Sequence, residues 1–210
     1  MLDPSVLAVV ALASLALAIV PGPAVLYIVT RSVSQGRAAG VASVAGIHVG
    51  TVAHVVAAAL GLSALLMRSV LAFSVVKYAG AAYLIYLGIS TLRQNGEQGG
   101  SVDLREQSLR RIFNQGIVVN VLNPKTALFF FAFLPQFVEP GRGAVALQMV
   151  LLGLVFIVVA FTSDTIYALV SSGLGHRLRS SARFARRQRN LSGGVYLALG
   201  VSTALTGSRT

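Results

Sequence analysis

Long apolar stretches alternate with short polar ones along the chain. Three of the apolar stretches, residues 4–30, 38–67 and 143–163, contain no Asp, Glu, Lys or Arg. A helix needs roughly 20 apolar residues to cross the hydrocarbon core of a bilayer, and each of these stretches is long enough. The whole pattern predicts an all-α membrane protein with six transmembrane helices, near residues 5–29, 40–66, 70–92, 113–137, 144–174 and 190–206.

The six predicted helices divide into two groups of three. The polar segment 93–111 predicts a flexible cytoplasmic linker between residues 1–92 and residues 112–210. Residues 87–91 of the third helix read Leu-Gly-Ile-Ser-Thr, and residues 199–203 of the sixth read Leu-Gly-Val-Ser-Thr. Because three helices carry the chain to the other side of the membrane, a second copy would enter it upside down. We therefore expect one membrane domain built from two inverted three-helix repeats.

Each predicted repeat carries a helix break in its first helix. Pro21, Gly22 and Pro23 interrupt the first helix, and Pro124 interrupts the fourth. Proline has no N–H and clashes with the preceding turn, so backbone groups near it lose their helical partners. In a membrane such groups are tolerated only where protein or a water-filled cavity satisfies them. Paired breaks of this kind favour binding or gating over a simple packing kink.

Composition and charge agree with a membrane location. Of the 210 residues, 55% are hydrophobic and 11% are charged, whereas about a quarter of a soluble domain is charged. The net charge of +11 does not indicate nucleic-acid binding, because the basic residues lie in short loops between apolar stretches. The loops after helices one, three and five hold twelve of the 17 Lys and Arg residues. We therefore expect a multi-pass protein of the bacterial inner membrane, with these loops in the cytoplasm and both termini outside.

Missing motifs exclude several kinds of chemistry. The chain has no cysteine, so it holds neither a disulfide nor a Cys-based metal site. It also lacks a GxxxxGK[ST] phosphate loop and the GxSxG and HExxH motifs of hydrolases. We expect no cofactor and no ATP hydrolysis within this chain. The energy for transport would then come from an ion gradient or from the substrate's own gradient.

Two charged residues lie deep within predicted helices. Lys125 is about a dozen residues from either end of its helix, roughly 18 Å, which is too far for its side chain to reach the headgroups. Asp164 is the only acidic residue within any predicted helix. A charge at this depth is costly and marks a route for substrate, ion or proton. Lys125 would bind the carboxylate of an amino acid and Asp164 its ammonium group, or Asp164 would carry a proton. The alternative is an internal salt bridge between the two.

The second predicted helix contains His48, Thr51 and His54. Metal binding is disfavoured because the spacing is unsuitable and acidic or thiol partners are missing. Each histidine would be either a proton relay or a hydrogen-bonding residue of the core. The glycines of the same helix predict close packing against a neighbour. They are Gly40, Gly46, Gly50 and Gly61.

Several motifs together resemble a known family. They are Pro21-Gly22-Pro23 followed by GRAAG at 36–40, AAALGL at 57–62, KYAGAAYLIYLG at 77–88, NVLNPKTALFF at 120–130, LPQF at 134–137 and SDTIY at 163–167. In these motifs the chain is similar to the LysE-type amino-acid exporter superfamily, in its homoserine/threonine efflux branch. The similarity extends over nearly the whole chain.

This resemblance implies a function. It implies an antiporter that exports neutral amino acids or derivatives, such as homoserine, homoserine lactone or threonine, driven by the proton motive force. The two helix breaks, Asn123 beside the second break, Lys125 and Asp164 fall on motif positions of the family, and Tyr167 ends the last motif. We expect Asn123 and Tyr167, like Lys125 and Asp164, to take part in substrate binding or coupling. Many relatives carry Asp where this chain has Thr51, so coupling here would rely on Asp164 alone or would use His48 or His54.

Two other functions stay open from the sequence. The first is a passive small-solute channel, because an Asn-Pro pair at the end of a half-helix also suits a pore. The second, which is less favoured, is an intramembrane enzyme that uses His48, His54, Lys125 and Asp164 as acids and bases. The sequence also leaves open whether the protein forms a homo-oligomer.

Overall fold

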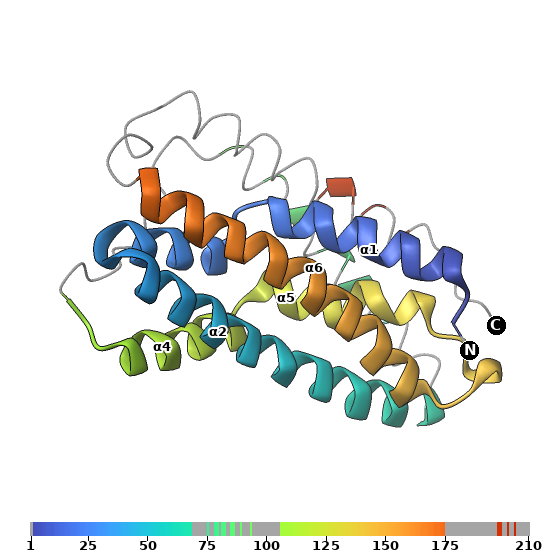
Figure 1. Cartoon of the computed structure of the whole chain (residues 1–210). Coiled ribbons are helices and arrows are strands. Elements are labelled where there is room, and N and C mark those ends of the chain that lie inside the picture. Colours follow the sequence, from blue (N-terminus) through green and yellow to red (C-terminus); the bar gives the residue numbers. More distant parts are fainter. Residues whose placement is uncertain are drawn as a thin grey trace.

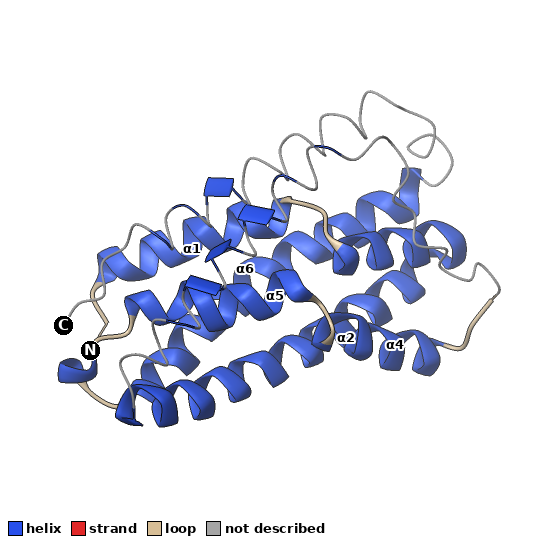
Figure 2. Cartoon of the chain, turned by 180° about the vertical axis from the view of Figure 1, so that it is seen from behind, coloured by secondary structure: helices blue, strands red, loops and turns tan. Residues whose placement is uncertain are grey.

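A computed structural model describes residues 2–68 and 106–174, together with single positions between 75 and 93 and between 197 and 204. For residues 62–68 and residue 174 it describes the backbone alone. Within these residues every regular element is a helix, as Figure 2 shows. The predicted helices at 70–92 and 190–206, the linker and the repeat relationship lie largely outside the described residues, so they remain predictions.

The first predicted helix is split at its prolines. Helix α1 runs from Pro4 to Ile19, and helix α2 begins at Pro23. Between them Val20 is extended, with φ −76° and ψ 114°. Proline is well tolerated in the first turn of a helix, where its missing N–H would have no helical partner. The predicted break in this helix is therefore confirmed.

Helix α2 spans Pro23–Arg68 and reverses direction at Gly36. Gly36 has φ 80°, a conformation that glycine adopts without steric cost. After the reversal the chain runs back along its own first segment, so that a Cβ built on Gly40 would lie 2.4 Å from the Ser32 hydroxyl. The second predicted helix therefore corresponds to the segment of α2 after this turn. In Figure 1 the two segments of α2 form a helical hairpin.

The fourth predicted helix is also broken where the sequence indicated. Helix α4 covers Leu109–Val121 and helix α5 covers Pro124–Leu128, with a bend of 47° between α4 and the segment that starts at Pro124. The chain continues as a π-helix, Phe129–Phe133, and a 3-10 helix, Leu134–Phe137. Such irregular helical turns are uncommon and are frequent at functional sites.

Helix α6 spans Val145–Leu174 and follows a short 3-10 turn at Pro140–Arg142. Within the described residues, α2 over Pro23–Gly61 and α6 over Val145–Gly173 are long and apolar enough to cross a membrane, and the bent pair of α4 and α5 would make a third span. Helix α1 is apolar but shorter. In the described ranges an all-helical fold with helices long and apolar enough to cross a membrane is thus confirmed, and the number six stays a prediction.

Close helix packing follows the glycines of α2. A Cβ on Gly46 would lie 2.1 Å from the carbonyl oxygen of Phe113, and one on Gly50 would lie 2.9 Å from the carbonyl oxygen of Ile117. These two positions let α4 approach α2 backbone to backbone, as small residues do in membrane helix pairs. Gly61 has no atom of another element within 4 Å of its would-be Cβ among the described residues, so the packing prediction stays a prediction there.

Candidate functional site

The two helix breaks meet at a buried cavity. Helix α6 packs against both α1 and α2, and α4 packs against α2, which brings α1, α2, α4, α5 and α6 together. The cavity between them has a volume of about 40 Å³, which is room for a few water molecules. Its lining residues are Leu17, Ala18, Gly22, Ala24, Val25, Ile47, His48, Thr51, Asn120, Asn123, Lys125, Thr126, Phe156, Ala160 and Asp164.

The C-terminus of α1 binds side chains from other helices. The last carbonyls of a helix have no partner within it. The carbonyl of Ile19 accepts a hydrogen bond of 2.8 Å from the Tyr167 hydroxyl of α6, and the carbonyl of Val20 accepts one from Lys125 Nζ of α5. Lys125, which follows the second break, thus binds the backbone carbonyl of Val20 at the first break.

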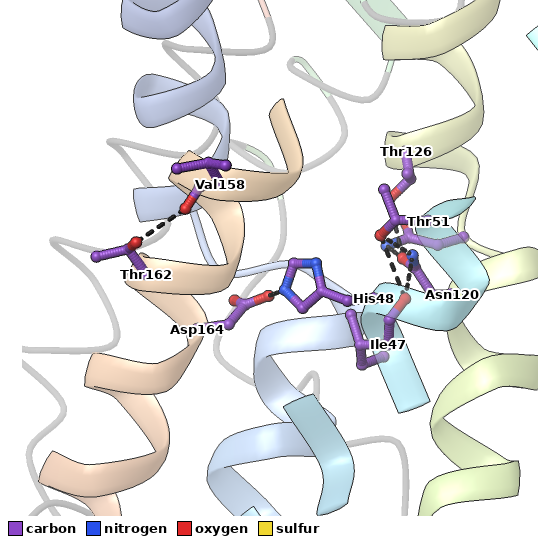
Figure 3. Close-up of polar contacts among 9 residues, drawn as sticks. Ile47, His48, Thr51, Asn120, Thr126, Val158, Thr162 and Asp164 are labelled. Atoms are coloured by element: carbon purple, nitrogen blue, oxygen red, sulfur yellow. Dashed lines mark hydrogen bonds and ion pairs between the residues drawn. The ribbon is translucent and has the colours of Figure 1, made fainter. Parts of the chain in front are cut away.

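Asp164 pairs with a histidine. Its Oδ2 lies 3.1 Å from His48 Nε2, and the two side chains are only 7% and 8% exposed. Figure 3 shows His48 reaching from α2 toward Asp164 on α6. Among the described residues this is the ion pair found for Asp164, and the alternative of a direct salt bridge between Lys125 and Asp164 is not seen there. Both charged residues nevertheless line the same cavity.

The rest of the His48 ring is also buried. Phe161 packs against it edge-on, with 5.2 Å between the ring centroids. Its Nδ1 is buried and has no hydrogen-bond partner among the described residues. Since an ionised carboxylate only accepts hydrogen bonds, Nε2 carries a proton whenever Asp164 is charged. His48 is therefore the hydrogen-bond donor to Asp164 in that state.

Asn120 on α4 is a site residue that the sequence analysis did not single out. Its amide Nδ2 donates to the carbonyl of Ile47 at 2.9 Å and to the hydroxyl of Thr51 at 2.8 Å, as Figure 3 shows. Its Oδ1 accepts from Thr126 at 3.0 Å and from Asn123 at 3.3 Å. Two donors and two acceptor positions are thereby used in full. Asn120 ties α2 to both sides of the second break.

Asn123 forms the second break itself. Its side-chain Oδ1 accepts a hydrogen bond of 3.1 Å from the backbone N–H of Lys125 and so caps α5. Asparagine is among the preferred residues for this position. The next residue, Pro124, occupies the first turn, where its missing N–H is not needed. The cap fixes the start of α5 and thereby the position of the Lys125 backbone beside the cavity.

His54 lies beside the site but does not line the cavity described above. Its Nε2 donates a hydrogen bond of 2.9 Å to the carbonyl of Asn120, since a carbonyl oxygen only accepts. Its ring stacks on Phe130, with 6.1 Å between centroids. This geometry is that of a hydrogen-bonding core residue. In the described part of the chain no three His, Asp or Glu side chains gather to hold a metal ion.

Comparison with known proteins gives one consistent result. The family model of the LysE type translocator matches residues 15–207. A homoserine/homoserine lactone efflux protein of Salmonella typhimurium is 40% identical over 164 residues, which cover 76% of this chain and 77% of that protein. An uncharacterized membrane protein of Vibrio cholerae is 27% identical over 193 residues, which cover 92% of this chain and 93% of that protein. No solved structure matches the chain.

Proposed function

Because this chain belongs to the LysE type translocator family, we propose that it exports neutral amino acids or their derivatives, such as homoserine, homoserine lactone or threonine, in exchange for protons. As a family member it is a transporter in a membrane and not an enzyme. In the proposed orientation the basic loops face the cytoplasm of a bacterial inner membrane, and both termini lie outside.

One observation carries the proposal. Residues beside both helix breaks line a single cavity that is also lined by Lys125, Asp164 and His48. Interrupted helices and buried charges are both costly in a bilayer, and their coincidence suits a site for a polar solute.

The chemistry of the cavity fits a zwitterion. The N-terminus of α2, at Gly22 and Ala24, and the ammonium of Lys125 supply positive character on one side. Asp164 supplies a carboxylate on another element. The substrate carboxylate would bind the first group and its ammonium the second. A carboxylate would then compete with the Val20 carbonyl for the donors of Lys125.

The same cavity provides a place for the proton. The pair of His48 and Asp164 is buried, and a substrate ammonium would need the Asp164 carboxylate in its charged form. A proton on that carboxylate would therefore exclude the substrate, which is the requirement for exchange. Thr51 is held by Asn120 and by Ile47, so it is not free to take the place of an acid.

Counterflow in proteoliposomes tests this proposal. Vesicles that contain the purified protein are loaded with unlabelled homoserine, threonine or lysine, and uptake of the labelled compound is followed. We expect saturable counterflow with homoserine or threonine and little with lysine, because the described residues place only one acidic side chain, Asp164, in the cavity. Uptake that rises linearly with concentration and lacks counterflow would show a passive channel instead.

A further inference from the structure

A second hollow lies away from the cavity, between the first segment of α2 and the N-terminal half of α4. Its volume is about 610 Å³. Three arginines line it: Arg31 from α2, and Arg110 and Arg111 from the first turn of α4. Ser108 caps that turn, and its hydroxyl accepts a hydrogen bond of 3.4 Å from the N–H of Arg111. The helix N-terminus adds positive potential to that of the side chains.

Arg31 is the most unusual of the three because it is 1% exposed. Its guanidinium donates to Gln35 at 3.2 Å and Gln115 at 3.3 Å, and it lies 5.7 Å from the ring centre of Tyr27. All of these partners are neutral, and its Nε has no partner among the described residues. A buried charge is ordinarily paired.

No ion pair joins these arginines to an acid in the part of the chain that the structure describes, and the exposed Glu106, which precedes α4, does not line the hollow. The ion pairs there join Asp164 with His48 and Glu139 with Arg142, and neither involves the hollow. Three cations therefore line one hollow without an ion-pair partner among these residues. Such a place favours an anion.

The remaining wall indicates what kind of anion. Val118 and Val119 continue the hollow along α4, and Val118 is 56% exposed. Leu122, one turn further along the helix, is 74% exposed. A free inorganic anion gains nothing from an apolar wall, whereas an amphiphile gains from both parts. Basic pockets between membrane helices on the cytoplasmic side suit anionic headgroups.

We propose that this hollow binds an anionic phospholipid, with the phosphodiester at Arg31, Arg110 and Arg111 and an acyl chain along Val118 and Val119. The orientation proposed above places the arginines at the cytoplasmic leaflet, but the binding itself needs no assumption about orientation or about transport. The lipid would compensate the buried charge of Arg31. It would also fix the N-terminus of α4 against α2.

Lipid titration of the full-length protein in mild detergent tests the proposal. Native mass spectrometry measures the binding of phosphatidylglycerol, with phosphatidylcholine of the same acyl chains as the neutral comparison. We expect phosphatidylglycerol to bind more tightly, and the double variant Arg110→Gln/Arg111→Gln to lose about tenfold or more in affinity. The control Arg37→Gln/Arg93→Gln removes two exposed arginines outside the hollow and should change the affinity little.

The opposing outcomes are equally clear. Equal affinity for both lipids, or equal loss in both double variants, would overturn the proposal. Displacement of phosphatidylglycerol from the wild-type protein by millimolar inorganic phosphate would show a free-anion site instead, and that experiment needs no variant. A melting curve of each variant without added lipid verifies that it is folded. Counterflow of homoserine by the same preparations reports separately on the proposed function.

Discussion

Lys125 donates a hydrogen bond to the carbonyl of Val20 and so joins the two helix breaks of the chain. The donor belongs to α5, just after the second break, and the acceptor is the residue that ends α1 at the first. The two positions are 105 residues apart in the sequence. This bond holds a side chain of the second break on the backbone of the first.

Substitution of Lys125 with alanine should weaken substrate binding. We expect the half-saturation concentration for homoserine counterflow to rise about tenfold or more, since a hydrogen bond to a charged group contributes about 1.5–3 kcal/mol. Counterflow rates at increasing concentrations measure it. An unchanged half-saturation concentration would remove Lys125 from the binding site.

Tyr167→Phe distinguishes substrate binding from the hydrogen bond that Tyr167 makes at the end of α1. The change removes only the hydroxyl that binds the carbonyl of Ile19. We expect a loss of about 1 kcal/mol in stability, seen as a lower melting temperature in detergent. The half-saturation concentration should stay near the wild-type value, in contrast to Lys125→Ala. An equal rise of the half-saturation concentration in both variants would mean that the contacts at the end of α1, and not the charge of Lys125, determine the affinity.

His48→Gln tests the proton pathway. Glutamine retains a donor for Asp164 but does not titrate, so the variant should keep counterflow and lose the response to an imposed pH gradient. Efflux from preloaded vesicles, with and without acid outside, measures this response. The companion His54→Gln should behave as wild type, because His54 binds a backbone carbonyl and does not line the cavity. A full gradient response in His48→Gln would exclude His48 from coupling.

Close packing of α2 on α4 predicts a contrast between two glycines. In Gly46→Ala the new methyl would lie 2.1 Å from the backbone oxygen of Phe113, whereas in Gly61→Ala the described residues leave space for it. We expect Gly46→Ala to cost about 1–3 kcal/mol, or to prevent folding, and Gly61→Ala to be neutral. Melting temperatures of the purified proteins compare them. Equal stability would mean that the helices have room to separate.

The helix breaks were predictable from the sequence because their cause is local. Proline lacks an N–H wherever it lies, so Pro21, Pro23 and Pro124 interrupt their helices whatever surrounds them. The apolar stretches likewise predicted α6 within one or two residues. A reversal between the first two predicted helices was expected within residues 30–39. Its place at Gly36, with helix on both sides, was not predicted, because a single glycine with a positive φ leaves no mark on the hydrophobic pattern.

The partners of the buried groups depend on packing and could not be read from the sequence. Lys125 and Asp164 were both recognised as buried charges, but their spacing along the chain does not say that His48 lies nearer to Asp164. Asn120 becomes central only because Gly46 and Gly50 bring α4 against α2. Without that packing, nothing in the sequence distinguishes Asn120 from the other polar residues of its helix.

Proton-driven efflux by Asp164→Asn tests the central claim most directly. Vesicles are loaded with labelled homoserine, acid is imposed outside, and efflux is compared between wild type, Asp164→Asn and the control Glu139→Gln, which removes a carboxylate from the loop before α6. We expect the acid pulse to accelerate efflux in the wild type and in Glu139→Gln and to have no effect in Asp164→Asn. Acceleration of the same size in Asp164→Asn would contradict the account.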